Sequence, residues 1–239
     1  MLFRSTLLCH LGEYEAALDP IRSAVRIWRL RSLDIEGRTA QLISAQVLGL
    51  HCFVQAESRD EARKWLGRVR STLARVTPAE LASEEQDRLT ALSNLESAAM
   101  MVQQGRWNHA WKNLVGVESW LDDADAHAVN TDEAALLRQR IRLLKTEVCL
   151  RQDQTRDALG IADEFMAHPA VGDAVRDKGQ HARLRAKLAA LLGSSGHSEA
   201  ARRALALAED ALDPDSQPTD ALRALCGIPQ MTALRESLA

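Results

Sequence analysis

Gly12-Glu13-Tyr14-Glu15-Ala16-Ala17-Leu18 is the first of five related stretches in this chain. The pattern returns in Glu57-Ser58-Arg59-Asp60-Glu61-Ala62, Gly105-Arg106-Trp107-Asn108-His109-Ala110-Trp111, Asp153-Gln154-Thr155-Arg156-Asp157-Ala158-Leu159 and Gly196-His197-Ser198-Glu199-Ala200-Ala201. Each stretch follows an apolar helical segment and opens a second one. Because a helix–turn–helix unit cannot bury its own apolar face, we expect successive units to stack into a continuous core.

The first residue of each stretch is interpreted as a turn residue, and these residues recur every 43–48 positions. Small or apolar residues follow the turn residue five, nine and twelve positions later. These three positions share one helix face. They are Ala17, Ala62, Ala110, Ala158 and Ala201; Ile21, Leu66, Leu114, Ala162 and Leu205; and Ala24, Val69, Val117, Phe165 and Ala208. This face of each second helix is therefore predicted to point into the core.

Capping patterns and Pro-containing breaks delimit the helices. A capping box is expected at Ser58 and Glu61, and the helix after Thr77 begins either there or at Ser83. The predicted helices are 1–11, 13–30, 34–56, 59–76, 79–104, 106–122, 131–152, 154–168, 173–193, 197–212, 219–226 and 231–238.

Gly12 to Leu18, with Ile21 and Ala24 behind them, resemble the second-helix signature of a tetratricopeptide repeat, and Gly105 to Ala110 do so as well. The resemblance covers about residues 1–212. It implies an all-α fold, a right-handed superhelical solenoid of about five antiparallel helix pairs. The units would be about 1–32, 33–77, 78–125, 131–168 and 170–212.

Units of 43–48 residues exceed the usual repeat of about 34. In this they resemble the regulatory repeat domains of bacterial signalling proteins, such as MalT-like activators and some GGDEF diguanylate cyclases. Residues 213–239 are expected to form short helices that cap the last repeat, with a linker to an output domain as the alternative.

In such arrays the first helix of each pair lines a concave groove. Carried onto this chain, the resemblance implies a partner-binding groove, and an ordinary solvated face is the alternative. The groove residues would be Thr6, His10, His51, Gln55, Gln103, Arg140, Glu147, Arg151 and Arg183. These side chains suit the carboxylates and backbone of a peptide or protein partner.

Other clusters have simpler interpretations. Arg138, Arg142 and Lys145 share one side of a helix, where a salt-bridged face is favoured over a phosphorylated or acidic partner. The dipeptides Cys9-His10 and His51-Cys52 are expected to be buried cysteines beside groove histidines. They do not predict a metal site, because adjacent residues on a helix point about 100° apart.

The tryptophans of the second helices, Trp65, Trp107, Trp111 and Trp120, are expected to pack in the core.

The net charge of −3, without a dense Lys/Arg block, argues against nucleic acid and anionic membranes as partners. The chain has no apolar run of about eighteen residues and no signal-peptide pattern, and its four cysteines form no CxxC pair. These observations indicate a cytoplasmic protein. No phosphate loop, catalytic triad or paired carboxylates stand out, so we expect neither enzymatic activity nor a cofactor.

The sequence thus favours a regulatory protein–protein interaction scaffold. The alternatives are a ligand-sensing domain of a larger bacterial transcription regulator or diguanylate cyclase, and a secretion or assembly chaperone.

Overall fold

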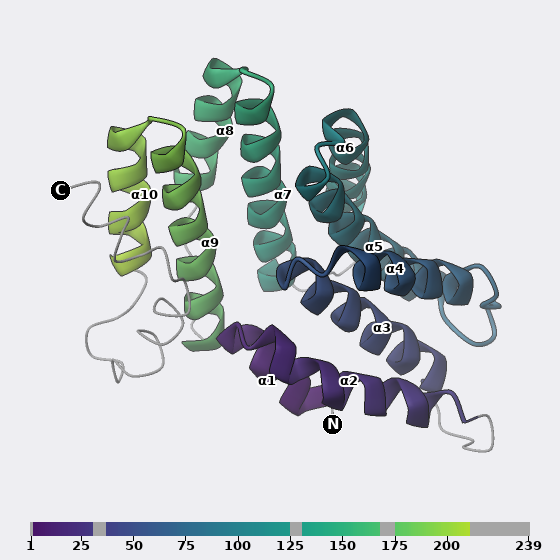
Figure 1. Ribbon diagram of the computed structural model, residues 1–239. Helices are drawn as coiled ribbons and strands as arrows, with labels where there is room; N and C mark the ends of the chain where they lie inside the picture. Colours follow the sequence, from purple (N-terminus) through teal and green to yellow (C-terminus); the bar gives the residue numbers. More distant parts are fainter. Residues whose placement is uncertain (1, 31–36, 125–130, 168–174, 211–239) are drawn as a thin grey trace. The chain divides into compact units, whose positions relative to one another are not determined.

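The computed structural model describes residues 2–30, 37–124, 131–167 and 175–210. These residues form ten α-helices joined by short turns and loops (Figure 1). The helices are α1 (Leu2–Leu11), α2 (Tyr14–Trp28), α3 (Arg38–Gln55), α4 (Arg59–Leu73), α5 (Ser83–Gln103), α6 (Trp107–Ala124), α7 (Thr131–Arg151), α8 (Thr155–Ala167), α9 (Val175–Ser194) and α10 (Ser198–Asp210). The predicted all-α class is confirmed. The predicted capping helices of residues 213–239 lie outside the described residues.

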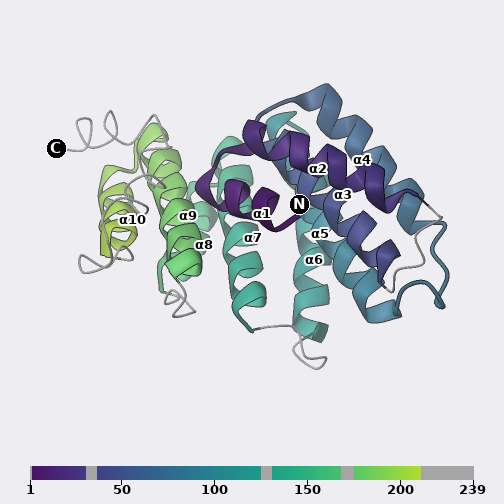
Figure 2. The ribbon, with the colours of Figure 1, turned by 90° about the horizontal axis from the view of Figure 1, so that it is seen from below.

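The helices pack mostly as sequential pairs within two compact units, Met1–Val117 and Glu118–Ala239. In the first unit, α2 packs between α1 and α3, and α3 also contacts α4 and α5 (Figure 2). In the second unit, α7 packs against α8 and α9, and α9 packs against α10. No helix in the described ranges is long and apolar enough to cross a membrane.

All five predicted turn residues adopt the left-handed backbone conformation. Their φ angles are 80° at Gly12, 55° at Glu57, 71° at Gly105, 59° at Asp153 and 82° at Gly196. Each carries the two backbone bonds of a Schellman motif, which satisfies carbonyl groups at the end of the preceding helix. The repeat register read from the sequence is therefore confirmed.

The Schellman bonds at Gly105 illustrate the shared geometry. Its N–H donates to the Val102 carbonyl at 3.0 Å, and the N–H of Arg106 donates to the Met101 carbonyl at 2.9 Å. Equivalent bonds occur at the other four turns, and in every copy the Ala five residues after the turn closes the first bond of the next helix. One local motif thus ends the first helix and starts the second.

The predicted core face of the second helices is also confirmed. Every residue at the three predicted offsets is buried, with at most 8 % of its surface exposed. The repeated Ala is 0–1 % exposed in all five copies, which lets the paired helices approach closely.

Buried polar side chains follow a different distribution. Those in the described part of the chain all lie on the first helices of the pairs: Ser5, Gln46, Ser93, Glu96, Ser97, Gln139, Thr146, His181 and Arg185. Several of them join one first helix to the next, as when His181 Nδ1 meets Gln139 Oε1 at 2.5 Å between α9 and α7. The buried polar groups therefore lie where first helices contact their neighbours, whereas contacts between successive pairs also involve second helices, as between α2 and α3.

Two local expectations are corrected at helix starts. Ser58 precedes α4 but its side chain makes no capping bond, so the expected capping box is not formed. Thr77 does donate to Glu80 from both its N–H and its hydroxyl, at 3.1 Å each. The following helix nevertheless begins at Ser83, because the residues between form only a turn.

The expectation that the tryptophans pack in the core holds only in part. Trp65 is 2 % exposed and lies so close to Gly49 of α3 that an added Cβ there would meet its ring at 2.3 Å. Trp107 and Trp120 are half-buried. Trp111 is 37 % exposed, so the core assignment was wrong for this residue, which falls outside the buried stripe of α6.

Replacing Glu57 by Gly tests the turn motif. Glu57 is exposed, and its left-handed φ strains any residue that carries a Cβ. We expect Glu57→Gly to raise the free energy of unfolding by about 1 kcal/mol, measured by urea denaturation. Ser58→Gly is the matched control, since Ser58 has a φ of −79° and should lose stability instead. A loss of stability in Glu57→Gly would show that the turn conformation is assigned incorrectly.

Candidate functional site

The groove residues predicted in the first unit take part in contacts between helices. His51 Nδ1 of α3 lies 3.0 Å from Glu96 Oε1 of α5, and its ring meets Tyr14 of α2 edge-on at 5.7 Å between centroids. Gln103 donates its side-chain amide to the Val54 carbonyl at 2.8 Å, which joins α5 to α3. These two side chains therefore hold neighbouring helix pairs together.

The other groove residues of the first unit are less informative. Thr6 and Gln55 are half-buried on α1 and α3, and each has an interaction with a neighbour. The side chain of His10 lies outside the described residues. A common groove formed by these residues stays a prediction.

In the second unit, Glu147 of α7 faces two cations, Arg151 on its own helix and Lys187 on α9. Burial raises the pKa of the Glu147 carboxyl, and the charges of Arg151 and Lys187 oppose this rise. Arg140 and Arg183 are half-buried and engaged with neighbours, and Arg151 is exposed. Glu147 is thus a largely buried acid at the α7–α9 contact.

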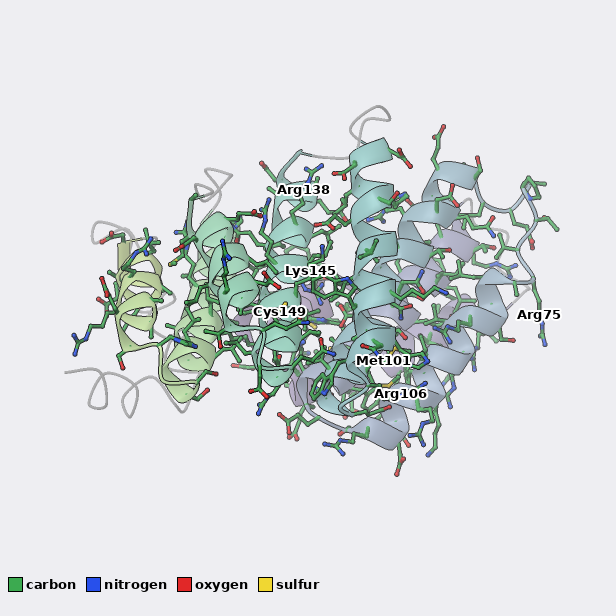
Figure 3. All side chains as sticks on the ribbon, turned by 90° about the horizontal axis from the view of Figure 1, so that it is seen from above. Arg75, Met101, Arg106, Arg138, Lys145 and Cys149 are labelled. Carbon is green, nitrogen blue, oxygen red and sulfur yellow. The ribbon has the colours of Figure 1, made fainter. Side chains whose placement is uncertain are left out.

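The basic residues Arg138, Arg142 and Lys145 of α7 form ion pairs with adjacent helices. Figure 3 shows Arg138 and Lys145 along this helix. Arg138 lies 3.6 Å from the Asp122 carboxylate and also donates to the Leu121 carbonyl, and Lys145 pairs with Glu118. The third member, Arg142, lies 3.9 Å from Glu164 of α8. The salt-bridged interpretation is confirmed, with ion-pair partners on the neighbouring helices α6 and α8.

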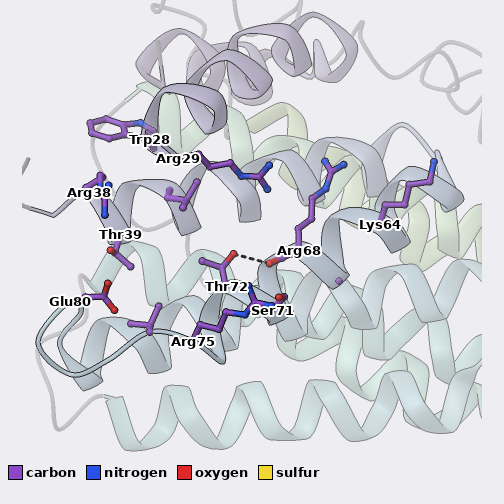
Figure 4. A pocket seen from close by; sticks show the side chains of 13 residues that line it. Trp28, Arg29, Arg38, Thr39, Lys64, Arg68, Ser71, Thr72, Arg75 and Glu80 are labelled. Carbon is purple, nitrogen blue, oxygen red and sulfur yellow. Dashed lines mark hydrogen bonds between the residues drawn. The ribbon is translucent and has the colours of Figure 1, made fainter. Parts of the chain in front are cut away.

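Basic residues that are distant from one another in the sequence line one cleft in the first unit (Figure 4). It has a volume of about 600 Å³ and opens between the end of α2, the start of α3, the length of α4 and the turn after α4. Its lining residues are Trp28, Arg29, Arg38, Thr39, Leu42, Lys64, Gly67, Arg68, Ser71, Thr72, Arg75, Val76 and Glu80. Five of these side chains are cationic and one is a carboxylate. We call this feature the cationic cleft.

Local contacts hold several of the cations in place. Arg38 donates to the Leu30 carbonyl at 3.2 Å, and Lys64 donates to Glu61 Oε1 at 2.6 Å. The guanidinium of Arg68 lies 5.4 Å from the centre of the Trp65 ring, a cation–π contact.

Arg29 and Arg75 have a different environment. Their side chains form no hydrogen bond or ion pair with any residue in the described ranges. The one carboxylate of the lining, Glu80, accepts the hydrogen bonds from Thr77. The cleft therefore presents more positive charge than its own residues neutralise.

Cations of α4 also act on Glu61, a residue of the same helix outside the lining. The hydrogen bond from Lys64 lowers the pKa of the Glu61 carboxyl, and the nearby charges of Lys64, Arg68 and Arg22 lower it further. A carboxylate that approaches this region is thus stabilised in its ionised form.

The cations are spread along a line and not focused on a point. Lys64, Arg68 and Arg75 follow one another along α4 and its C-terminal end. At 1.5 Å of rise per residue, the first and last are separated by about 16 Å along the helix axis. Trp28, Leu42 and Val76 add half-buried apolar surface beside them. This arrangement suits an extended ligand with several negative charges and an apolar group.

The cationic cleft was not anticipated from the sequence. The spacing of Lys64 and Arg68 places both on one helix face and was a usable signal. Arg29 and Arg38, however, reach the cleft only because α2 packs against α3 and α3 packs against α4. Elsewhere in the described residues, no group of three or more His, Cys, Asp or Glu side chains is arranged to hold a metal ion.

Replacing Glu147 by Gln tests the buried acid. The pKa of Glu147 in the folded protein is raised above the ordinary value of 4.5, which means that the folded state favours the protonated carboxyl. The folded protein therefore loses stability as the pH rises through this pKa and the carboxyl ionises. Glu147→Gln should therefore raise the melting temperature at pH 7 by a few degrees, and the gain should vanish near pH 4. Thermal unfolding followed by circular dichroism across this range measures the effect.

The exposed Glu164, on α8 of the same unit, is the matched control, and Glu164→Gln should show no gain at pH 7. If Glu147→Gln raised the melting temperature equally at all pH values, the charge of the buried carboxylate would not be the cause of its effect on stability.

Comparison with known proteins leaves the chain without a family. No protein-family model matches it, and no curated protein and no solved structure matches it either.

Proposed function

We propose that this chain is a non-enzymatic interaction module that binds an acidic segment of a protein partner in the cationic cleft. The observation that carries the proposal is the concentration of five basic side chains against one carboxylate in a cleft of about 600 Å³. Because the whole chain has a net charge of −3, this local excess is a specific feature and not a consequence of composition.

The distribution of charge favours an extended peptide over a single phosphate group. A phosphate needs its cations focused on one point, whereas the α4 cations extend over about 16 Å. An extended peptide covers that length with about five residues at 3.3 Å each. Alternate acidic side chains would meet the cations, and an apolar side chain would contact Trp28, Leu42 and Val76.

The cationic cleft is a better candidate than the groove along the first helices. His51 and Gln103 of that groove already bind neighbouring helices. Arg29 and Arg75 of the cleft have no such side-chain bonds in the part of the chain that the structure describes. A ligand that binds the cleft therefore does not have to break contacts between helix pairs.

We also propose that the helix pairs continue as a tetratricopeptide-type superhelical solenoid. The support is the identical left-handed turn and buried Ala in all five copies, since repeated local geometry generates a regular superhelix. Small-angle X-ray scattering should then report an elongated particle. A radius of gyration near that of a compact sphere, about 18 Å for this length, would contradict a solenoid.

Substitution in the cleft tests the peptide proposal. The variant Arg29→Gln/Arg68→Gln/Arg75→Gln should weaken binding of a fluorescein-labelled peptide of Glu residues around a central Leu by about tenfold. Each exposed charge pair contributes about 0.2–1 kcal/mol, and 1.4 kcal/mol corresponds to a factor of ten. Fluorescence anisotropy measures the affinity, and binding by the unmodified protein should weaken as salt is added.

The matched control is Arg26→Gln/Arg63→Gln/Arg106→Gln, which removes the same charge from exposed positions of the same unit outside the cleft. It should bind as the unmodified protein does. Equal loss in both variants would show a non-specific charge effect. Tighter binding of a single-stranded oligonucleotide of equal charge would overturn the choice of a peptide.

A further inference from the structure

Two cysteines from helices distant in sequence meet in the core of the first unit. Cys9 of α1 and Cys52 of α3 are separated by 43 residues, yet their Sγ atoms lie 3.1 Å apart. Both thiols are buried: Cys9 is 7 % exposed and Cys52 is fully covered. A disulfide requires an S–S distance of about 2.05 Å, so the two sulfurs need to approach by only about 1 Å.

We infer that Cys9 and Cys52 are an oxidisable dithiol, which a peroxide converts into an intrachain disulfide that fixes α1 to α3. This site is independent of the cationic cleft, because neither cysteine lines it. The pair also differs from Cys149, which is buried in the second unit.

Cys9 and Cys52 have different environments, and we therefore expect different roles for them in the oxidation. The hydrogen bond from the Cys52 thiol lowers the pKa of Cys9, and the same bond with burial raises the pKa of Cys52. Cys9 is therefore the thiol that ionises first, and it is also the one with some exposure to solvent. A small peroxide is a suitable oxidant for such a covered site, whereas a bulky disulfide such as oxidised glutathione has little access.

The reaction balances in two steps. The Cys9 thiolate attacks one peroxide oxygen, an S–O bond forms, the O–O bond breaks, and the departing hydroxide takes up a proton to become water. Cys52 sulfur then attacks the Cys9 sulfenic acid, an S–S bond forms, and the hydroxyl group leaves as water with the Cys52 proton. Two thiols and one peroxide thus yield one disulfide and two waters, and an added dithiol reverses the change.

The disulfide has a structural consequence for the first unit. α1 is the first helix of the described residues, and it packs mainly against α2, with fewer contacts to α3. A covalent bond that closes a loop of this length reduces the entropy of the unfolded chain, and it should raise the melting temperature by roughly 5–10 °C.

The test treats the full chain with hydrogen peroxide, blocks the remaining thiols with iodoacetamide and maps the peptides without reduction. We expect a peptide containing Cys9 joined to one containing Cys52, released by dithiothreitol, in protein that runs as a monomer on a non-reducing gel. Cross-links of Cys9 or Cys52 to any other cysteine, or full alkylation of both, would overturn the inference.

Variants separate the specific pair from general oxidation. Cys9→Ala should abolish the cross-link and the rise in melting temperature, while Cys149→Ala, the matched buried control, should keep both. If Cys9→Ala fails to fold, peptide mapping of the unmodified protein still decides the pairing. If the disulfide formed without a rise in melting temperature, the claim that it fixes α1 to α3 would be wrong.

Discussion

The left-handed turn between paired helices is the constraint on which the rest of the described structure depends. It reverses the chain within two residues and satisfies the carbonyl groups at the end of the first helix, while the same few residues start the second helix. Since the Ala that follows is buried in every copy, the turn also determines which face of the second helix points inward. Pairing, register and core are thus consequences of one local geometry.

The two helices of a pair bury different kinds of side chain. The second helices bury an apolar stripe and leave their other faces to solvent, where charged side chains cost little. The first helices bury polar groups, and some of these bond across the contacts between helices, as His51 does with Glu96 and His181 with Gln139. The cationic cleft lies at the end of α2, at the start of α3 and along α4, and none of the residues in these two bonds lines it, so a ligand that binds there leaves them intact.

The cationic cleft and the dithiol both belong to the first unit and arise from packing between helices. The cationic cleft combines side chains from α2, α3 and α4, so its positive field exists only when these helices are in contact. The dithiol likewise requires α1 to lie against α3. Peptide binding in the cleft and formation of the disulfide therefore both require a folded first unit.

The sequence by itself determined the ten described helices apart from the start of α5, together with the five turns and the buried face of each second helix. These follow from local rules, because backbone strain at a turn and the 3.6-residue period act between residues a few positions apart. It did not determine the environment of Trp111 or the partners of Arg138 and Lys145, because these depend on which neighbouring helix covers a given face. Only the tertiary structure brought Arg29 beside Arg68 and Cys9 beside Cys52: contacts across tens of residues leave no periodic signal, and they are set by how the pairs pack.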